Sequence, residues 1–400
     1  MNLVHSIKRE LTALWGDGLG KSLVVIATGW GLLLGTRMVY PMLLPHFRES
    51  FDLSLAVAGL LVTILWLGSA VGQLPGGILA DRYGERRCLS AGALSVAVAL
   101  VFVVTAPSAV VLFVATGVIG LGQSLYPIAR ITILSKLYPD RLGSALGATM
   151  ATGDLGQMLL PPIAGALAAT FMWQVGLAVL IPPIVLLGLL LWLVLPAQSG
   201  ADSAVDALST DTVRYVLAEL RRPNMVFMSS LLFLYILVWQ SFTGFYPTYL
   251  IEVKGLPVSR AALLFSLFFA IGVVVKPLAG AAYDRIGFRG SLIGVLVGPF
   301  VGFLALPSAD SLWALVVVTA LISTMLGSGA ITQSFLAESF AEDMRGTGLG
   351  AVRTMAATLG AAGPVLFGIV ADRGYFDEGY LLLAAILSAV ILLTFRISRP

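Results

Sequence analysis

The sequence predicts an all-α polytopic membrane protein with twelve transmembrane helices, arranged as two six-helix pseudo-repeats. Three observations predict this fold. Hydrophobic residues make up 58% of the 400 residues and charged residues only 11%, about half the charged share of a soluble domain. Apolar runs of about twenty residues recur along the chain, long enough to cross about 30 Å of hydrocarbon as helices. The two halves of the chain also repeat the same special residues at one fixed offset.

The chain begins with residues 1–21, which carry both basic and acidic side chains. A cleaved secretory signal has an apolar core followed by small residues, and this segment lacks that core. We therefore expect residues 1–21 to form an uncleaved amphipathic segment on the cytoplasmic surface of the membrane.

The twelve predicted spans come next. Their boundaries are 22–45, 54–79, 89–106, 109–134, 143–169, 173–195, 225–250, 258–282, 290–307, 311–336, 347–371 and 379–395. Between the sixth and seventh spans the aliphatic run gives way to Gln, Ser, Asp, Thr and charged residues. This change predicts a cytoplasmic linker at 197–223. It separates an N-terminal bundle, 22–196, from a C-terminal bundle, 224–400.

The distribution of basic residues predicts the orientation. Twelve crossings place both termini on one side, and if that side is cytoplasmic, 16 of the 24 Lys and Arg residues lie in cytoplasmic segments and four in outer loops. Such an excess is typical of cytoplasmic loops. It also accounts for the net charge of +3, so we expect contact with membrane lipid and none with nucleic acid. Short loops favour the cytoplasmic membrane of a prokaryote.

An ungapped offset of 203 residues relates the two halves. It superposes Gly77 on Gly280, Asp81 on Asp284, Arg82 on Arg285, Gly84 on Gly287, Asp140 on Asp343, Gly143 on Gly346, Gly147 on Gly350, Pro161 on Pro364 and Gly165 on Gly368. Six helices repeated in the same direction predict two bundles related by an axis along the membrane normal. A binding site is then expected between the bundles, near the midplane.

The loop after the second span, residues 76–87, reads Gly-Gly-Ile-Leu-Ala-Asp-Arg-Tyr-Gly-Glu-Arg-Arg. Gly77 lets helices approach closely, Gly84 permits a tight turn, and Asp81 can lie against a helix N-terminus. A glycine, a spaced Asp-Arg, a second glycine and a basic pair resemble the signature of the major facilitator superfamily.

This resemblance covers about residues 22–396 and implies a secondary transporter whose two halves rock around a fixed site. It also implies a gate on the cytoplasmic side, whose residues latch the halves rather than bind substrate. We assign to this gate Gly77, Asp81, Arg82, Gly84, Arg86, Arg87, Asp284 and Arg285.

Five charged residues lie well within the predicted spans, away from their ends, where an unpaired charge costs about 2.5 to 3.5 kcal/mol. They are Arg37, Arg130, Asp154, Lys276 and Arg353. Four cations face one anion, which favours an anionic small-molecule substrate. One cysteine and two histidines are too few to predict a metal site. No cofactor is expected, and no set of residues predicts an enzyme.

We predict that Arg37, Lys276 and Arg353 bind the anion. Tyr40 lies one helical turn from Arg37. The offset of 203 places Gln240 in the second half at the position that corresponds to Arg37. We expect Tyr40 and Gln240 to orient the substrate. The resemblance implies that the helices carrying these residues line the substrate cavity between the two halves. A cation pair on the eighth and eleventh helices is similar to that of the oxalate and monocarboxylate branches of the superfamily.

Asp154 is our candidate for proton coupling in a symporter, because a buried carboxylate binds a proton readily and would release it when Arg130 approaches. Two alternatives stay open. Arg130 could be a purely structural partner of Asp154, and Arg130 or Lys276 could extend to the cytoplasmic surface.

The predicted function is alternating-access transport of a small organic or inorganic anion by a protein that functions as a monomer. The alternative is proton-coupled export of lipophilic or cationic compounds. A Gly-Pro pattern in the fifth span, residues 156–165, favours this alternative because it partly matches drug exchangers of the superfamily. Thr116 argues against it, since it stands where those exchangers carry an arginine.

Overall fold

The structure is a computed structural model that describes residues 19–197, 223–340 and 345–397. Most of the predicted amphipathic segment (1–21) and of the predicted linker (197–223) lies outside these residues. The described residues form helices joined by short connections, with no strand among them.

The helices of the first half are α2 (Gly20–Phe51), α3 (Leu55–Val71), α4 (Gln73–Tyr83), α5 (Glu85–Val104), α6 (Ala109–Ser124), α7 (Tyr126–Leu137), η2 (Pro139–Arg141), α8 (Leu142–Thr170), α9 (Trp173–Ala178) and α10 (Ile181–Val194). Those of the second half are α12 (Pro223–Glu252), α13 (Val258–Ala305), η4 (Leu306–Ser308), α14 (Leu312–Ser323), η5 (Thr324–Gly327), α15 (Ser328–Ser339), α16 (Arg345–Gly360), α17 (Gly363–Asp372) and α18 (Phe376–Arg396).

Each predicted span has a helical counterpart. Among the described residues, nine helical segments are long and apolar enough to cross a membrane, and the pair α3 and α4, bent by 42°, makes ten. The eleventh is α8, a helix of 29 residues that is not among these ten. The twelfth arises because α13 contains two predicted spans joined at Gly287, where the backbone leaves the helical conformation. The twelve-helix arrangement is thus consistent with the structure.

The predicted repeat extends to the backbone. Gly84 has φ of 89° and Gly287 has φ of 73°, a left-handed conformation that glycine adopts without steric cost. These two glycines are 203 residues apart and stand at equivalent turns. The sequence offset therefore reflects a shared local structure in the two halves.

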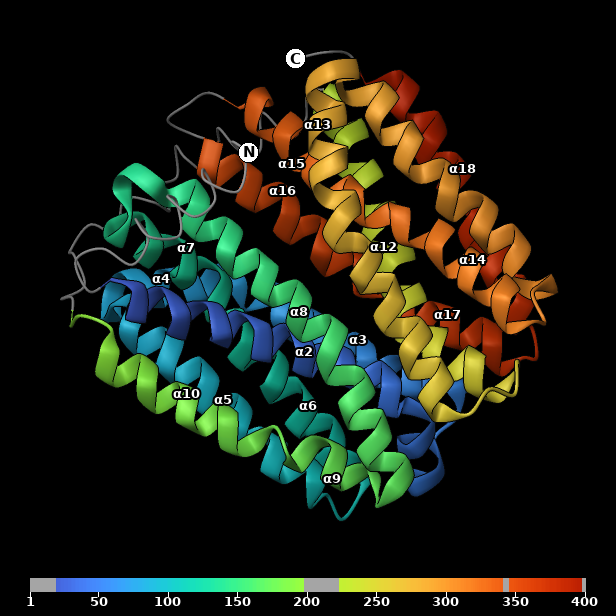
Figure 1. The fold of residues 1–400 in the computed structure, drawn as a ribbon, viewed down its shortest axis with the longest axis horizontal. Coiled ribbons are helices and arrows are strands. Elements are labelled where there is room, and N and C mark those ends of the chain that lie inside the picture. The colour runs from blue at the N-terminus through green and yellow to red at the C-terminus, as the bar shows by residue number, and fades with distance from the viewer. Residues whose placement is uncertain (1–18, 198–222, 341–344, 398–400) are drawn as a thin grey trace, which may run out of the picture.

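The two halves lie side by side, with α2 to α10 in blue to green and α12 to α18 in yellow to red (Figure 1). They meet closely at the end of the bundle that carries the α2–α3 and α12–α13 connections, which we call the closed end. There Arg48 pairs with Glu252, and the backbone N–H of Leu55 donates to Asp372 Oδ1 at 2.9 Å.

The opposite end carries Gly84 and Gly287, and we call it the open end. A Cβ atom placed on Gly143, Gly147 or Gly280 would meet no atom within 4 Å. Gly143 and Gly147 precede Asp154 by eleven and seven residues, so they share its face of α8. The halves are therefore joined at one end of the bundle and separate at the other.

Candidate functional site

Arg37 on α2 is buried, with 9% of its surface exposed, and neutral groups hold it in place. Its Nε donates to Gln123 Oε1 at 2.8 Å and its Nη2 donates to Ser69 Oγ at 2.7 Å. The guanidinium also lies over the ring of Trp66, with Cζ 4.6 Å from the ring centroid. Among the described residues no carboxylate pairs with Arg37 and its Nη1 has no hydrogen-bond partner. A fixed guanidinium with a free N–H group suits an anion.

Close packing between α2 and α8 positions this arginine. A Cβ atom on Gly31 would lie 2.6 Å from the carbonyl oxygen of Thr152, and one on Gly35 would lie 2.5 Å from that of Gly156. Larger side chains would push α8 away. These glycines therefore bring Arg37 on α2 and Asp154 on α8 into neighbouring regions of the first half.

Tyr40 is fully buried, and its hydroxyl accepts a hydrogen bond from Thr116 Oγ1 at 3.2 Å. The same Thr116 hydroxyl approaches the carbonyl oxygen of Leu112 at 2.7 Å. Thr116, where drug exchangers carry an arginine, therefore packs against Tyr40. The structure shows no direct contact between Tyr40 and Arg37.

Gln240 on α12 is 2% exposed, and its Oε1 has no hydrogen-bond partner among the described residues. A Cβ atom on Gly244, one turn along the same face, would lie 3.5 Å from Val62 of the first half. The face of α12 that carries Gln240 is thus directed at the first half. Beside it, the rings of Trp66 and Trp239 pack edge to face across the boundary, with centroids 5.0 Å apart.

Asp154 and Lys276 form an ion pair that joins the two halves, with Lys276 Nζ 2.5 Å from Asp154 Oδ1. Gln157 supports the carboxylate at the longer distance of 3.4 Å. The structure therefore pairs Asp154 with Lys276 of α13, whereas Arg130, one possible partner of Asp154 from the sequence, bonds Thr149 instead. It also shows that Lys276 does not extend to the membrane surface.

Arg130 and Arg353 have separate partners. Arg130 Nη1 donates to Thr149 Oγ1 at 2.6 Å, and its guanidinium lies 4.1 Å from the ring centroid of Trp30. Arg353 is exposed and donates to Gln333 Oε1 at 3.1 Å. Arg37, Arg130 and Arg353 thus each bond different neutral groups, while Lys276 pairs with Asp154.

The predicted gate residues lie at the open end, on α4, α5 and α13. Arg82 lies over Tyr83 and Arg86 over Trp192, with Cζ 5.4 Å and 4.6 Å from the ring centroids. Asp81, Asp284 and Arg285 make no ion pair with any described residue. The predicted latch between the halves stays a prediction, because the halves are separate at this end. Nearby, Glu338 accepts a hydrogen bond from the Tyr283 hydroxyl.

Several residues of the site were missed by the sequence analysis because they are neutral. Gln123 and Ser69 bond Arg37, and Trp30 and Trp66 cover guanidinium groups. The signal that could have identified Gln123 is an amide in an otherwise apolar span, where a polar group needs a partner.

Comparison with known proteins decides the family. The family model described as Major Facilitator Superfamily matches residues 25–364. The chain belongs to the major facilitator superfamily. It is therefore a multi-pass membrane protein and a secondary transporter, and not an enzyme.

Curated relatives within this superfamily are distant but nearly full length. The chain is 24% identical over 382 residues to the hexuronate transporter of Bacillus subtilis, covering 89% of each protein. It is 24% identical over 362 residues to the cis,cis-muconate transport protein of Acinetobacter baylyi, covering 86% of this chain and 85% of that protein. It is also 25% identical over 381 residues to sugar efflux transporter A of Dickeya chrysanthemi, covering 88% and 91%.

Solved structures of superfamily transporters share the fold. A bacterial homolog of the human lysosomal transporter Spinster, in an inward-facing and unoccupied conformation, matches with a TM-score of 0.78 and 17% identity. The match covers 96% of this chain and 98% of that one. At this identity the likeness supports the fold alone.

Proposed function

We propose that this transporter moves a small organic anion, with a carboxylate as the group that is recognised. Arg37 supports this proposal best. Its charge is buried without a carboxylate partner, its orientation is fixed by Gln123 and Ser69, and one of its terminal nitrogens is free. A buried guanidinium in this state gains much of its stabilisation from an incoming anion.

The charge balance supports the same proposal. Of the five charged residues singled out within the spans, four are cations, and Asp154 neutralises only Lys276. Arg37, Arg130 and Arg353 then have neutral partners only, among the described residues. An anion near the boundary of the halves would lower the cost of keeping these cations within the membrane.

The names of the curated relatives support a carboxylate substrate in two of three cases. Hexuronate and cis,cis-muconate, named in two of them, are carboxylates, whereas the name of the third concerns sugar efflux. We assign anion binding to Arg37, Lys276 and Arg353, with Tyr40 and Gln240 shaping the site around them. Asp154 is the proposed proton-coupling group.

The difference between the closed end and the open end supports an alternating-access cycle. In this conformation the site is reached from the open end, and the cycle requires the opposite arrangement, in which the closed end separates. The excess of basic residues near the open end supports a cytoplasmic location for it, in the cell membrane. The gate residues Asp81, Arg82, Asp284 and Arg285 would meet when that end closes. The protein is proposed to work as a monomer.

The test is uptake of radiolabelled D-glucuronate and cis,cis-muconate by purified protein in liposomes. Arg37→Gln is expected to lower kcat/KM by about 10- to 100-fold, since hydrogen bonds to charged groups contribute about 1.5 to 3 kcal/mol. The control is Arg260→Gln, which removes an exposed arginine at the start of α13. Uptake that is indifferent to Arg37→Gln would contradict the proposal. Competition by lipophilic cations, and not by carboxylates, would support the exporter alternative.

A further inference from the structure

The ion pair between Asp154 and Lys276 differs from the other ion pairs of the described residues. Arg48 and Glu252 also join the two halves, but at the exposed closed end. Two further pairs, Lys136 with Glu85 and Lys254 with Asp310, each lie within one half. Among the ion pairs given for the described residues, the one between Asp154 and Lys276 joins the halves inside the spans, so this pair is placed to respond to whatever binds between them.

The direction of Lys276 shows that the pair stands where contact between the halves ends. Helical side chains tilt toward the N-terminus of their helix, and α13 begins at the closed end, so Lys276 points into the bundle to reach Asp154. One turn beyond it, a Cβ on Gly280 would meet nothing within 4 Å, and the same holds for Gly147 on α8. The side chains of Lys276 and Asp154 are 29% and 13% exposed. The pair is therefore not covered by protein on all sides.

Neither member of the pair has a second ionic partner among the described residues. The cations on the surrounding elements are Lys276 on α13, Arg130 on α7, Arg37 on α2 and Arg353 on α16. The other three have neutral partners among the described residues: Arg130 bonds Thr149, Arg37 bonds Gln123 and Ser69, and Arg353 bonds Gln333. An anion that takes the place of Asp154 on Lys276 would leave this carboxylate without its ionic partner, in a region where a bare charge is costly.

We propose that Lys276 exchanges Asp154 for the anionic group of the substrate, and that the displaced Asp154 carboxylate takes up one proton from water at the open end. This inference rests on the proposed function. The charges balance, because Lys276⁺ with Asp154⁻ becomes Lys276⁺ with the substrate anion and a neutral Asp154. The proton forms an O–H bond on the Asp154 carboxylate and is returned to water when the anion leaves and Lys276 recovers its partner. One proton thus accompanies each negative charge that Lys276 binds.

The experiment measures proton uptake directly. Purified protein in weakly buffered detergent solution with a pH-indicator dye receives D-glucuronate or cis,cis-muconate, and probe binding is measured in parallel. The wild type is expected to take up about one proton for each anion bound. Asp154→Asn, which keeps the shape of the side chain, is expected to take up none. It should nevertheless bind the probe about fivefold or more tightly at neutral pH, within the usual range of coupling between two sites.

Lys276→Gln separates partner exchange from a purely structural brace. Partner exchange predicts that Lys276→Gln binds the probe about fivefold or more weakly, and that the double variant Asp154→Asn/Lys276→Gln stays weak. A brace predicts that both single variants bind weakly and that the double variant recovers. Glu252→Gln, which breaks the ion pair at the closed end, is the matched control and should leave proton uptake unchanged. Elution profile and thermal unfolding check that each variant is folded.

The outcomes distinguish this inference from the proposed function. Binding of a probe by the wild type without proton uptake would overturn the exchange and leave anion transport intact. Recovery in the double variant would do the same. Absence of any binding or uptake of these carboxylates by the wild type would contradict the proposed function, and the exchange with it.

Discussion

The closed and open ends of the bundle use the same kind of residue in opposite ways. At the closed end, Cβ atoms placed on Gly59 and Gly368 would lie 2.4 and 2.5 Å from backbone oxygens of the opposite half. At the open end, Cβ atoms on Gly147 and Gly350, which are equivalent in the repeat, would meet nothing within 4 Å. The presence of glycine at positions that face open space in this conformation is explained if these positions pack against the other half in another conformation. The difference indicates that the open end is also built to close.

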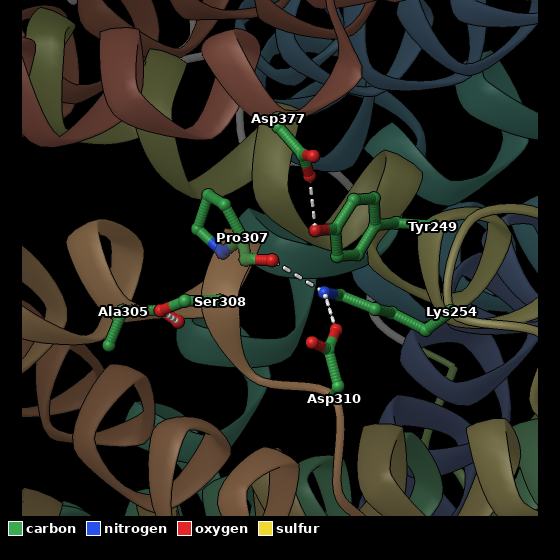
Figure 2. Close-up of polar contacts among 7 residues, drawn as sticks. All are labelled: Tyr249, Lys254, Ala305, Pro307, Ser308, Asp310 and Asp377. Atoms are coloured by element: carbon green, nitrogen blue, oxygen red, sulfur yellow. Dashed lines mark hydrogen bonds and ion pairs between the residues drawn. The ribbon is translucent and has the colours of Figure 1, made fainter.

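Polar contacts brace the closed end within the second half as well (Figure 2). Lys254 Nζ donates to the carbonyl oxygen of Pro307 at 2.6 Å and to Asp310 at 2.9 Å. The Tyr249 hydroxyl donates to Asp377. These bonds tie the end of α12 to η4 and α18. The parts of the second half that contact the first half are thereby held together and can move as one body.

The largest effect is expected from Gly59→Ala. The added methyl group would lie 2.4 Å from the carbonyl oxygen of Pro364, which is backbone and cannot turn aside. Overpacking of this kind costs about 1 to 3 kcal/mol, so we expect a lower Tm, and loss of transport because the closed end no longer seals. Thermal unfolding in detergent and liposome uptake measure the two effects. An unchanged Tm would mean that the halves do not approach this closely.

A smaller effect is expected from Asp372→Ala. Asp372 accepts a hydrogen bond from the backbone N–H of Leu55, in the first turn of α3 and on the opposite half. A carboxylate at a helix N-terminus contributes about 0.5 to 2 kcal/mol. We expect Tm to fall less than in Gly59→Ala, with Asp372→Asn in between because it keeps the acceptor and loses the charge. Arg373→Ala, the exposed neighbour, serves as the control, and an equal fall in that variant would contradict a specific contact.

The spans and the repeat could be predicted because they rest on local requirements. A helix that crosses the membrane needs a long apolar run wherever it stands, and a turn with positive φ favours glycine in both halves, as Gly84 and Gly287 show. The bends within spans were not predicted. The break between α3 and α4 lies at Gly72, directly before Gln73 and Pro75, so a local signal for it is present inside the predicted span 54–79.

The partners within the site could not be predicted from spacing. Helical periodicity shows which residues share a face of one helix, but the rotation of each helix and the conformational state decide which face meets which. For this reason spacing alone could not show that Asp154 forms its ion pair with Lys276 of the opposite half and not with Arg130. Charge alone identified Arg37, whereas its partners Gln123 and Ser69 are two among many neutral residues in the spans.

The smallest effect on stability is expected from Gly147→Ala, and it tests the comparison most sharply. The added methyl group meets no atom within 4 Å, and alanine stabilises a helix interior by about 0.5 to 1 kcal/mol relative to glycine. Tm should therefore stay the same or rise, opposite in sign to the identical change at Gly59. Turnover in liposomes should nevertheless fall, because the face of α8 that carries Gly147 must pack against the other half when the open end closes. Wild-type turnover would show that this face stays open throughout the cycle, and the comparison between the two ends would then describe a permanent asymmetry.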